Sequence, residues 1–600
     1  MDFRKIKRGY NYLKQNGIKK SIKKLKLRYN IKKNMKNISF DYSDYIKNNT
    51  LTKENIERQI KTKFEIMPKI SIVIPMYNTK FEFFIELIES IISQTYSNFE
   101  VILIDSSKFC SKEIVEYLKD INDERIIYKK IEKNLGISEN TNEAIKIATG
   151  DYIAFCDHDD TISEDALFEV VRAINEKNSD FIYSDEDILQ DGIRKNPHFK
   201  PDFSPDLLTS YNYICHLCVV KKTLLDEIGM LDSRFDGAQD YDFCLRATEK
   251  AKCIYHIPRI LYHWRAHSTS TSMNSSAKEY VYNAGKMAIE EHFKRLNIDA
   301  KVKILEEPGR YRVDYAIIGS PKVSIIIPNK DGKQDLKKCV ESILDSTYKN
   351  YEIIIVENNS TKNDIFEYYK KLQEKYTNIK VVKCEINGFN YSTINNFGVA
   401  NSTGQYLILL NNDTKVISKD WIENMLGICQ RQDVAIVGAK LLYPDFTVQH
   451  AGVVIGIGGI AGHVNINISE NDPGYFSRAT VINNFSAVTA ACLMIKRRVF
   501  EKIGGFDEEF AVAFNDIDLC LKVRKEGLNV VYTPYAKLNH YESKTRGMED
   551  TPEKIKRFSQ EIDRFKNKWD ELLEKRDPYY NENLRLDKVN FEINTNKNGG

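Results

Sequence analysis

The sequence has no apolar run long enough to cross a membrane as a helix. None approaches the roughly 18 apolar residues that a bilayer requires, and the N-terminus lacks the apolar core of a signal peptide. The eleven cysteines form no paired framework, which predicts a reducing, cytoplasmic setting. One C-x-x-C occurs, Cys215 to Cys218 with His216 inside it. Because no second pair lies near, core thiols are favoured over a zinc site.

Acidic residues are almost absent from the first forty positions. Asp2 is the only acid before Asp41, among many Lys and Arg. Apolar side chains recur there at helical spacing, which predicts a basic amphipathic helix on the inner face of an anionic plasma membrane. A solvated arm and a nucleic-acid-binding segment are the alternatives. We expect no nucleic-acid partner for the chain as a whole. The apolar positions are Ile18, Ile22, Leu25 and Tyr29.

The most informative feature is an internal repeat. Four segments recur in the same order, and both members of the first pair are short β-branched runs that end in Pro, as a buried parallel strand entering a loop does. The pairs are KISIVIPMYN (69–78) with KVSIIIPNKD (322–331), NFEVILIDSS (98–107) with NYEIIIVENN (350–359), ATGDYIAFCDHDD (148–160) with STGQYLILLNNDT (402–414), and IGMLDSRFDGAQDYDFCLR (228–246) with IGGFDEEFAVAFNDIDLCLK (503–522).

The spacing of the repeats locates an insertion. Pro75 and Pro328 are 253 residues apart, whereas Gly229 and Gly504 are 275 apart. The second copy therefore gains about twenty residues between its acidic motifs. We expect the Gly-rich stretch 450–464 to belong to an extra loop over the substrate pocket.

Strands that alternate with amphipathic, helix-length segments predict an α/β fold with a mostly parallel sheet and right-handed crossovers. We predict a basic arm over 1–67, one α/β domain over 68–305, a second over 318–550, and a C-terminal helix and tail over 551–600. Thr551 and Pro552 are typical of a helix start.

An acidic cluster closes the fourth strand of the first copy. Asp157, Asp159 and Asp160 offer hard oxygen ligands for Mg²⁺ or Mn²⁺ at the strand end, where open α/β sheets bind ligands. The second copy reads Asn-Asn-Asp, with Asp413 aligned to Asp159. We predict Asp157, Asp159 and Asp413 as metal ligands. The alternative is an Asx-rich turn that caps the next helix.

A second acidic motif precedes a helix in each copy, AQDYD (238–242) and FNDID (514–518). We interpret Asp240 and Asp516 as catalytic bases that deprotonate an acceptor hydroxyl. Each carboxylate could instead be only a helix N-cap. The recurrence of both motifs in order favours the catalytic interpretation.

A histidine follows in each copy, His263 and His540, at 277 residues' separation. We predict that both complete the metal shell or contact phosphates. Arg265 and Arg546 suit bidentate contact with a diphosphate. A satisfied core histidine is the alternative at each position.

These motifs, in this order, resemble inverting family 2 glycosyltransferases of the GT-A fold over roughly 70–305 and 322–547. The segments FKPDFSPDLL (199–208) and DPYYNENL (577–584) are similar to those of tandem-domain bacterial O-antigen, rhamnan and flagellin-glycan transferases. The resemblance implies a UDP- or dTDP-linked sugar donor and a glycan, lipid-linked or protein-linked acceptor. It implies that these residues contact the nucleotide sugar: Pro75, Tyr77, Asp105, Asn134, Asn142, Asp157 and Arg265, then Pro328, Lys330, Glu357, Asn387, Asn395, Asn411 and Arg546.

The sequence departs from the family pattern in places. The usual Asp-Asp-Gly-Ser is Asp105-Ser-Ser here and Glu357-Asn-Asn in the second copy, an Arg common before Asn142 is Thr141, and Lys330 replaces Tyr77. These departures weaken the base-pocket predictions, and they indicate that the two sites take related but different substrates.

The resemblance implies a bifunctional, metal-dependent hexosyl- or deoxyhexosyltransferase, with rhamnosyl transfer and flagellin glycosylation among the candidate activities. A rival interpretation makes the second copy a non-catalytic glycan-binding scaffold, because it keeps one carboxylate where the first has three. A nucleotidyltransferase is disfavoured, since neither IPMYNTK nor IPNKDGK supplies a Gly-rich phosphate loop.

Overall fold

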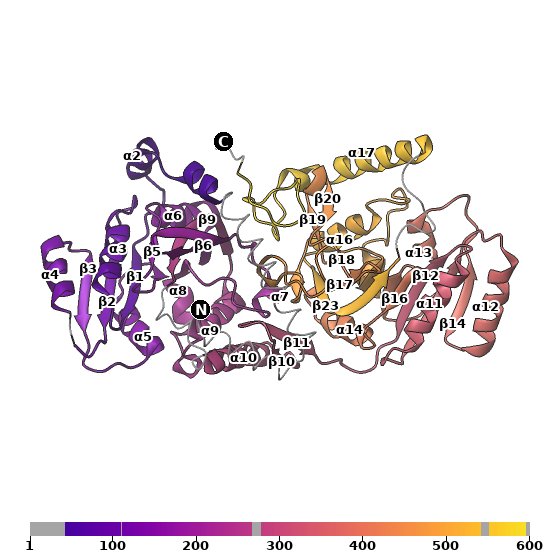
Figure 1. Ribbon diagram of the computed structural model, residues 1–600, viewed down its shortest axis with the longest axis horizontal. Helices are drawn as coiled ribbons and strands as arrows, with labels where there is room; N and C mark the ends of the chain where they lie inside the picture. Colours follow the sequence, from indigo (N-terminus) through magenta and orange to yellow (C-terminus); the bar gives the residue numbers. More distant parts are fainter. Residues whose placement is uncertain (1–41, 110, 267–277, 542–550, 596–600) are drawn as a thin grey trace, which may run out of the picture.

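The computed structural model describes residues 42–109, 111–266, 278–541 and 551–595. Figure 1 shows two α/β halves side by side, each built on one sheet. The predicted basic helix over 1–41 lies outside the described residues. No helix within the described ranges is both long and apolar enough to cross a membrane.

The first half contains a mixed sheet in the order β3-β2-β1-β4-β8-β6-β9-β5, with β7 paired to β6. The neighbours from β3 to β4 are parallel, and β8 is antiparallel to both β4 and β6. The strands are β1 Ile70–Met76, β2 Phe99–Asp105, β3 Ile126–Lys130, β4 Tyr152–Phe155, β5 Thr161–Ile162, β6 Phe181–Gln190, β7 Ile193–His198, β8 Cys218–Lys221 and β9 Ile254–Arg265.

Helices cover both faces of this sheet, so β1 and β2 are buried along their whole length. Residues 42–49 are also helical and pack on the β6–β9 region through Tyr42 and Tyr45. The helices are α2 Lys53–Lys61, α3 Phe81–Ile92, α4 Lys112–Ile121, α5 Ile137–Ile147, α6 Ala166–Lys177, α7 Pro205–Leu208, α8 Lys222–Ile228, α9 Gln239–Lys250 and α10 Lys278–Arg295.

The second half repeats the same strand order, β14-β13-β12-β15-β22-β17-β23-β16. The predicted tandem α/β architecture is therefore confirmed. A small hairpin of β10 Ala300–Ile304 and β11 Tyr311–Tyr315 joins the halves. The strands are β12 Val323–Asn329, β13 Tyr351–Glu357, β14 Ile379–Lys383, β15 Tyr406–Leu410, β16 Thr414–Val416, β17 Val434–Leu442, β18 Val448–His450, β19 Val453–Ile455, β20 Ala461–His463, β21 Asn483–Asn484, β22 Cys492–Lys496 and β23 Asn529–His540.

The helices of this half are α11 Lys333–Leu344, α12 Asn363–Lys375, α13 Tyr391–Ala400, α14 Trp421–Gln430, α15 Arg497–Lys502, α16 Asn515–Lys525 and α17 Pro552–Glu574. The last is the predicted C-terminal helix, and its start is confirmed: the Thr551 side chain accepts a hydrogen bond from the Lys554 amide. In Figure 1, α17 lies along the outside of the second half.

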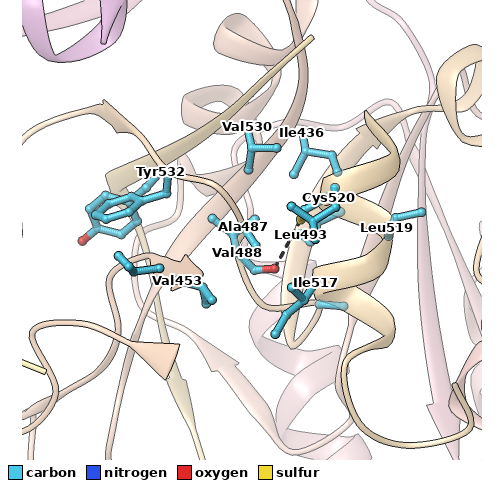
Figure 2. Close-up of a cluster of buried hydrophobic side chains, with 14 of the residues drawn as sticks. Ile436, Val453, Ala487, Val488, Leu493, Ile517, Leu519, Cys520, Val530 and Tyr532 are labelled. Carbon is cyan, nitrogen blue, oxygen red and sulfur yellow. Dashed lines mark hydrogen bonds between the residues drawn. The ribbon is translucent and has the colours of Figure 1, made fainter. Parts of the chain in front are cut away.

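A buried apolar cluster fixes the start of α16, which carries one of the predicted bases. Figure 2 shows Ile517, Leu519 and Cys520 of α16 among side chains from the sheet beneath. The Cys520 thiol donates to the Val488 carbonyl at 3.6 Å. Because such cores are densely packed, the first turn of the helix is held firmly against the sheet.

The insertion in the second copy forms a structured element rather than an open loop. The Gly-rich stretch 450–464 contains the β19–β20 hairpin, and its Val453, Val454 and Val464 are buried. The expectation of a pocket-covering loop was wrong in form, because these β-branched side chains pack into the core. The insertion still reaches the site region through Gln449, as described below.

Segments far apart in the sequence hold the two halves together. Asp206, in the FKPDFSPDLL stretch of the first half, forms a buried ion pair with Arg431 of the second. Asn484 donates to Asp206 at 2.9 Å and accepts from Ser204 at 2.8 Å. Asp206 is fully buried and Arg431 nearly so, which makes the pair strongly interdependent.

The C-terminal strap, residues 576–593, lies against both halves. The Asn581 amide donates to Asp185 and to the Lys200 carbonyl at 2.9 Å each, both in the first half. Asp577 accepts from the Ile455 amide at 2.7 Å and from Ser486 at 2.7 Å, both in the second half. The DPYYNENL and FKPDFSPDLL stretches therefore meet between the halves, where Asp202 donates its amide to the Pro578 carbonyl.

We predict that Asp206→Ala lowers the free energy of unfolding by about 3–5 kcal/mol, because it removes the fully buried partner of Arg431 and leaves only the half-exposed Asp433 carboxylate beside that charge. Urea denaturation followed by tryptophan fluorescence and far-UV circular dichroism measures the change. The matched control, Asp206→Leu with Arg431→Met, should recover most of the loss. A single variant as stable as the unmodified protein would contradict the assignment of this pair.

Candidate active sites

The first site is a pocket at the carboxyl ends of β1 and β4. These strands are parallel neighbours, so their ends meet at one edge of the sheet. Pro75, Asp157 and Asp240, three of the predicted site residues, line the pocket together with Cys215 and His216. The structure thus brings the acidic turn and the first candidate base into one cavity.

Asp157 and Asp160 of the acidic turn 156–160 have different surroundings. Asp157 is about half exposed and faces the pocket. Asp160 is fully buried and accepts from the Tyr262 hydroxyl at 2.6 Å and the Arg265 amide at 2.6 Å. Burial holds the pKa of the Asp160 carboxyl well above its usual range, and the Asp157 and Asp159 charges raise it further. Asp160 therefore braces the turn.

Arg265 braces the same turn from the end of β9. Its guanidinium donates to the Asp159 carbonyl at 2.5 Å and to Glu86 at 2.6 Å, over the ring of Phe83. The side chain is nearly buried. Arg265 could contact a diphosphate only by giving up its hydrogen bonds to the Asp159 carbonyl and to Glu86.

Asp240 lies in the first turn of α9, whose N-cap is Ala238. Its carboxylate accepts from the Asn212 amide at 2.9 Å. Burial raises the pKa of Asp240, Asp157 raises it further, and the positive form of His216 opposes the rise. In the second half the N-cap of α16 is Phe514. The N-cap interpretation is therefore wrong for both Asp240 and Asp516.

The predicted nucleotide-side residues of the first half are placed around the ends of β1 and β2. Asp105 is buried and accepts from the Tyr128 hydroxyl at 2.7 Å, and Tyr77 is 48% exposed. Asn134 accepts from the Gly136 amide at 3.0 Å. Asn142 instead ties α5 to the chain before α9, as shown below.

The second site is built around Asp413 and His540. The Nε2 atom of His540 lies 3.2 Å from Asp413 Oδ1 and 3.3 Å from the Asn411 amide nitrogen. Its Nδ1 atom faces the Gln449 carbonyl oxygen at 2.7 Å. Because a side-chain amide oxygen only accepts, the Nδ1 atom carries a proton.

Asp516 completes this site from the start of α16. It accepts from the Ala490 amide at 3.1 Å and the Ile517 amide at 2.9 Å. Tyr391 stands near both acids: burial raises its pKa, and the Asp516 and Asp413 charges raise it further. The structure thus brings the predicted metal ligand and base of the second half together.

On the nucleotide side of the second half, Glu357 is buried and accepts from the Ser360 amide at 2.6 Å and the Tyr369 hydroxyl at 2.6 Å. Lys330 and Asn387 are exposed, and Pro328 is half-buried. Arg546 lies outside the described residues.

Two of the predicted matches between the copies are wrong by one residue. Asp187 of β6 pairs with His263, and the equivalent Leu442 of β17 pairs with Asn539. His263 is thus the counterpart of Asn539, and Trp264 is the counterpart of His540. A slip of one residue along a strand turns the side chain to the other face.

His263 accordingly faces away from the pocket. Its Nδ1 atom lies 2.7 Å from Asp187 and its Nε2 atom 3.2 Å from the Ser163 hydroxyl. Both ring nitrogens already have protein partners, so the structure does not place His263 in a metal shell with Asp157.

The second mismatch concerns Asn142, which was matched with Asn395. Asn142 exchanges two hydrogen bonds with the Leu231 backbone, at 2.9 and 3.0 Å. Asn396 makes the same reciprocal pair with the Phe506 backbone, at 3.0 Å each. Asn396 is therefore the counterpart of Asn142. Both serve to fix the chain that leads to the candidate base, while Asn395 is buried within α13.

Two residues at the sites escaped sequence reasoning, His216 and Gln449. His216 lines the first pocket, with Nε2 3.7 Å from Asp157 Oδ2. Cys218, the second cysteine of the C-x-x-C, is a buried residue of β8, as expected of a core thiol. Comparison of the two copies could not find His216 or Gln449, because neither has an equivalent of the same residue type in the other copy. A histidine directly before the strand that pairs with β4 was the available signal.

No cluster of three or more His, Cys, Asp or Glu side chains able to hold a metal ion occurs in the parts of the chain that the structure describes. The ligands that the protein offers are pairs, and a diphosphate would supply the remaining oxygens. Asp413 Oδ1 is buried, accepts no hydrogen bond from the described residues and lies 3.2 Å from His540 Nε2. A carboxylate oxygen and an imidazole nitrogen at this separation are ligand types that divalent metals accept, so this pair fits a divalent metal.

Each half is an α/β domain of the GT-A type, with a carboxylate after a central strand and a second acid in the first turn of a later helix. The model described as "Glycosyl transferase family 2" matches residues 71–227 and 324–504, more than half of the chain. The protein belongs to glycosyltransferase family 2. Both matched stretches include the metal-side acids and end before Asp240 and Asp516.

Relatives cover both halves. The protein y4gI of Sinorhizobium fredii is 44% identical over 539 residues, 88% of this chain and 59% of its own length. The O-antigen biosynthesis protein RfbC of Myxococcus xanthus is 37% identical over 526 residues, 86% of this chain and 40% of its own length. The chain thus spans about half the length of these relatives. A solved fragment of S. aureus TarS, at 22% identity, gives a TM-score of 0.30 over 38% of this chain and 65% of its own; the fold assignment rests on the sheets and the family match instead.

We predict that His540→Ala weakens Mn²⁺ binding at the second site at least tenfold, because it removes one of two protein ligands. Titration calorimetry of the full chain with Mn²⁺ and UDP, in an Asp157→Asn, Asp159→Asn background, isolates that site. His263→Ala is the matched control, titrated in an Asp413→Ala background that isolates the first site, and it should lower thermal stability without changing Mn²⁺ affinity there. Equal effects of the two variants on Mn²⁺ affinity would overturn the register assignment.

We also predict that turnover at the first site falls as pH drops through a pKa higher than the ordinary aspartate value of 3.8. The reason is that burial raises the pKa of Asp240, and only its deprotonated form accepts a proton. The pH profile of kcat/KM in an Asp516→Asn background measures this limb. Asn212→Ala should move the limb further up, since it removes a donor to the carboxylate. A limb at or below pH 4 would contradict the prediction.

Proposed function

We propose that the chain is a bifunctional glycosyltransferase, with one inverting transfer site in each half. The observation that carries the proposal is that Asp240 and Asp516 begin equivalent helices and face the acidic strand ends at Asp157 and Asp413. Two transfer sites, one in each of two halves with the same fold, explain why both acidic motifs recur in the same order.

The mechanism follows from these positions. The deprotonated carboxylate of Asp240 or Asp516 accepts the proton of an acceptor hydroxyl. The hydroxyl oxygen attacks the anomeric carbon from the face opposite the nucleoside diphosphate, and the bond between that carbon and the diphosphate oxygen breaks. One displacement inverts the anomeric configuration and needs no enzyme nucleophile.

Mg²⁺ or Mn²⁺ would be held by Asp413 and His540 in the second site, and by Asp157 with Asp159 in the first. A bound divalent cation neutralises charge on the leaving diphosphate. The protein itself holds the metal-binding side chains in position. Tyr262 and Arg265 brace the first acidic turn, and the Gln449 oxygen fixes the orientation and tautomer of His540.

The substrates that we propose are UDP- or dTDP-linked hexoses or deoxyhexoses, including rhamnose, and the product is a bacterial surface glycan. The 37% identity to an O-antigen biosynthesis protein over most of this chain supports that class of product. The acceptor is a growing glycan on a lipid or protein carrier, flagellin included. We propose a cytoplasmic enzyme with peripheral contact at the inner membrane face through the basic residues 1–41.

A scaffold role for the second half is the competing proposal, because Asn411 stands where the first half has Asp157. The Asp413–His540 pair and the Asp516 carboxylate support catalysis there instead. Calorimetry of Asp413→Ala with nucleotide sugars and Mn²⁺ separates the two proposals, since a scaffold would be indifferent to the change.

We predict that Asp240→Asn and Asp516→Asn each abolish one of two transfers, lowering its rate by about 10²–10⁴-fold, because an amide cannot accept the proton. The full chain is incubated with a panel of nucleotide sugars, and nucleotide release is measured. Affinity for the donor should stay within about twofold.

Asp226→Asn is the matched control for this experiment, because Asp226 is an exposed acid on α8 that pairs only with Lys222 at the surface. It should leave both transfers unchanged. Full turnover by the Asp240→Asn, Asp516→Asn double variant would overturn the assignment of the bases.

A further inference from the structure

His216 lines the first pocket together with Asp157 and Asp240, the two acids that we assign to transfer. It comes from the chain just before β8, and its Nε2 atom lies 3.7 Å from Asp157 Oδ2. In an in-line displacement the transferred sugar lies between the leaving diphosphate and the acceptor hydroxyl. A side chain that lines the pocket with both the metal-side acid and the base is therefore placed to contact that sugar.

The protein holds His216 in one orientation. Its ring stacks on Tyr262, with centroids 4.5 Å apart and planes 13° apart. Its backbone amide donates to Glu186 at 3.2 Å, and its carbonyl accepts from the Lys200 ammonium at 2.6 Å. Lys200 is fully buried and pairs with Glu186 at 3.1 Å. Such support is what a precisely aimed polar contact requires.

The surroundings also fix which ring nitrogen carries the proton. The Nδ1 atom of His216 is buried and has no hydrogen-bond partner among the described residues. A buried N–H without an acceptor is costly, whereas a bare lone pair costs less, so the neutral ring carries its proton on Nε2. The Nε2 atom lies 3.7 Å from Asp157 Oδ2, which is too long for a direct hydrogen bond. A ligand oxygen beside this pair can reach both atoms at hydrogen-bond distance.

The second half has no counterpart of this histidine. Lys221 pairs with Tyr152, and Lys496 pairs with Tyr406, at equivalent places in the two sheets. Counting back along each strand sets Ala491 at the position of His216. The second site has His540 instead, whose Nδ1 donates to Gln449 and whose Nε2 lies 3.2 Å from the metal-side acid. The two histidines thus have different surroundings and suit different ligands.

We propose that the His216 Nε2–H donates a hydrogen bond to a hydroxyl of the sugar transferred at the first site, and that this hydroxyl in turn donates to Asp157. The contact makes His216 a specificity-determining residue, and its replacement by Ala491 gives the second site a different sugar preference. This inference rests on the proposed sugar transfer.

The experiment uses the full chain in an Asp413→Ala, His540→Ala background, so that donor binding with metal is measured at the first site. Binding of UDP-glucose, UDP-galactose, UDP-N-acetylglucosamine and dTDP-rhamnose is measured by calorimetry beside UDP and dTDP. With the best donor, His216→Ala should lose about tenfold in affinity, while affinity for the matching nucleoside diphosphate stays the same. One lost hydrogen bond corresponds to about that factor. His216→Gln, which keeps an N–H donor, should recover part of the loss.

A deoxy analogue of the best donor, lacking the contacted hydroxyl, should bind equally to the unmodified protein and to His216→Ala. Equal losses for the nucleotide sugar and the bare nucleotide would overturn the proposal, as would loss of Mn²⁺ affinity measured by electron paramagnetic resonance, which would make His216 a metal ligand. Absence of binding by every nucleotide sugar to the unmodified protein would instead refute the proposed sugar transfer itself.

Discussion

In both halves the strand that carries the acidic turn lies parallel to, and beside, the first strand of its sheet. β4 pairs with β1, and β15 pairs with β12, in the same register. Parallel neighbours end at the same edge of a sheet. This pairing therefore places the acidic turn beside the loop that follows β1 or β12. The antiparallel strand next to it, β8 or β22, then starts at that edge and delivers His216 or Ala491 there. The remaining features of each site depend on this arrangement.

The two halves have the same strand order, but different side chains support their sites. In the first, Asp160 and Arg265 are committed to bracing the turn, which leaves Asp157 facing the pocket with His216 opposite. In the second, His540 takes its orientation from Gln449, a residue beside the inserted hairpin. Each site region therefore contains a histidine, but the two come from different strands and have different neighbours.

The halves are also bound to one another by structure close to the sites. Lys200, which supports the His216 carbonyl, is itself covered by Asn581 of the C-terminal strap. Asp577 of the strap holds β19 of the inserted hairpin in the second half. One segment thus supports the surroundings of both sites, and the buried Asp206–Arg431 pair fixes the halves at the same interface.

The sequence alone determined the repeat, the α/β class, the two acidic motifs in each copy and the Thr551 cap, because these depend on local pattern and on residue type. It could not set the register of β9 and β23, since the spacing between matched residues drifts from 253 to 276 along the chain and a drift of one residue reverses the face of a strand. That is why His263 was matched wrongly. Asn395 was matched wrongly because the spacing has already grown from 253 to 254 at α13. Tertiary structure alone decided that Arg265 is a brace, that His216 enters the pocket and that the chain's last segment joins the halves, because each of these is a contact between residues distant in sequence.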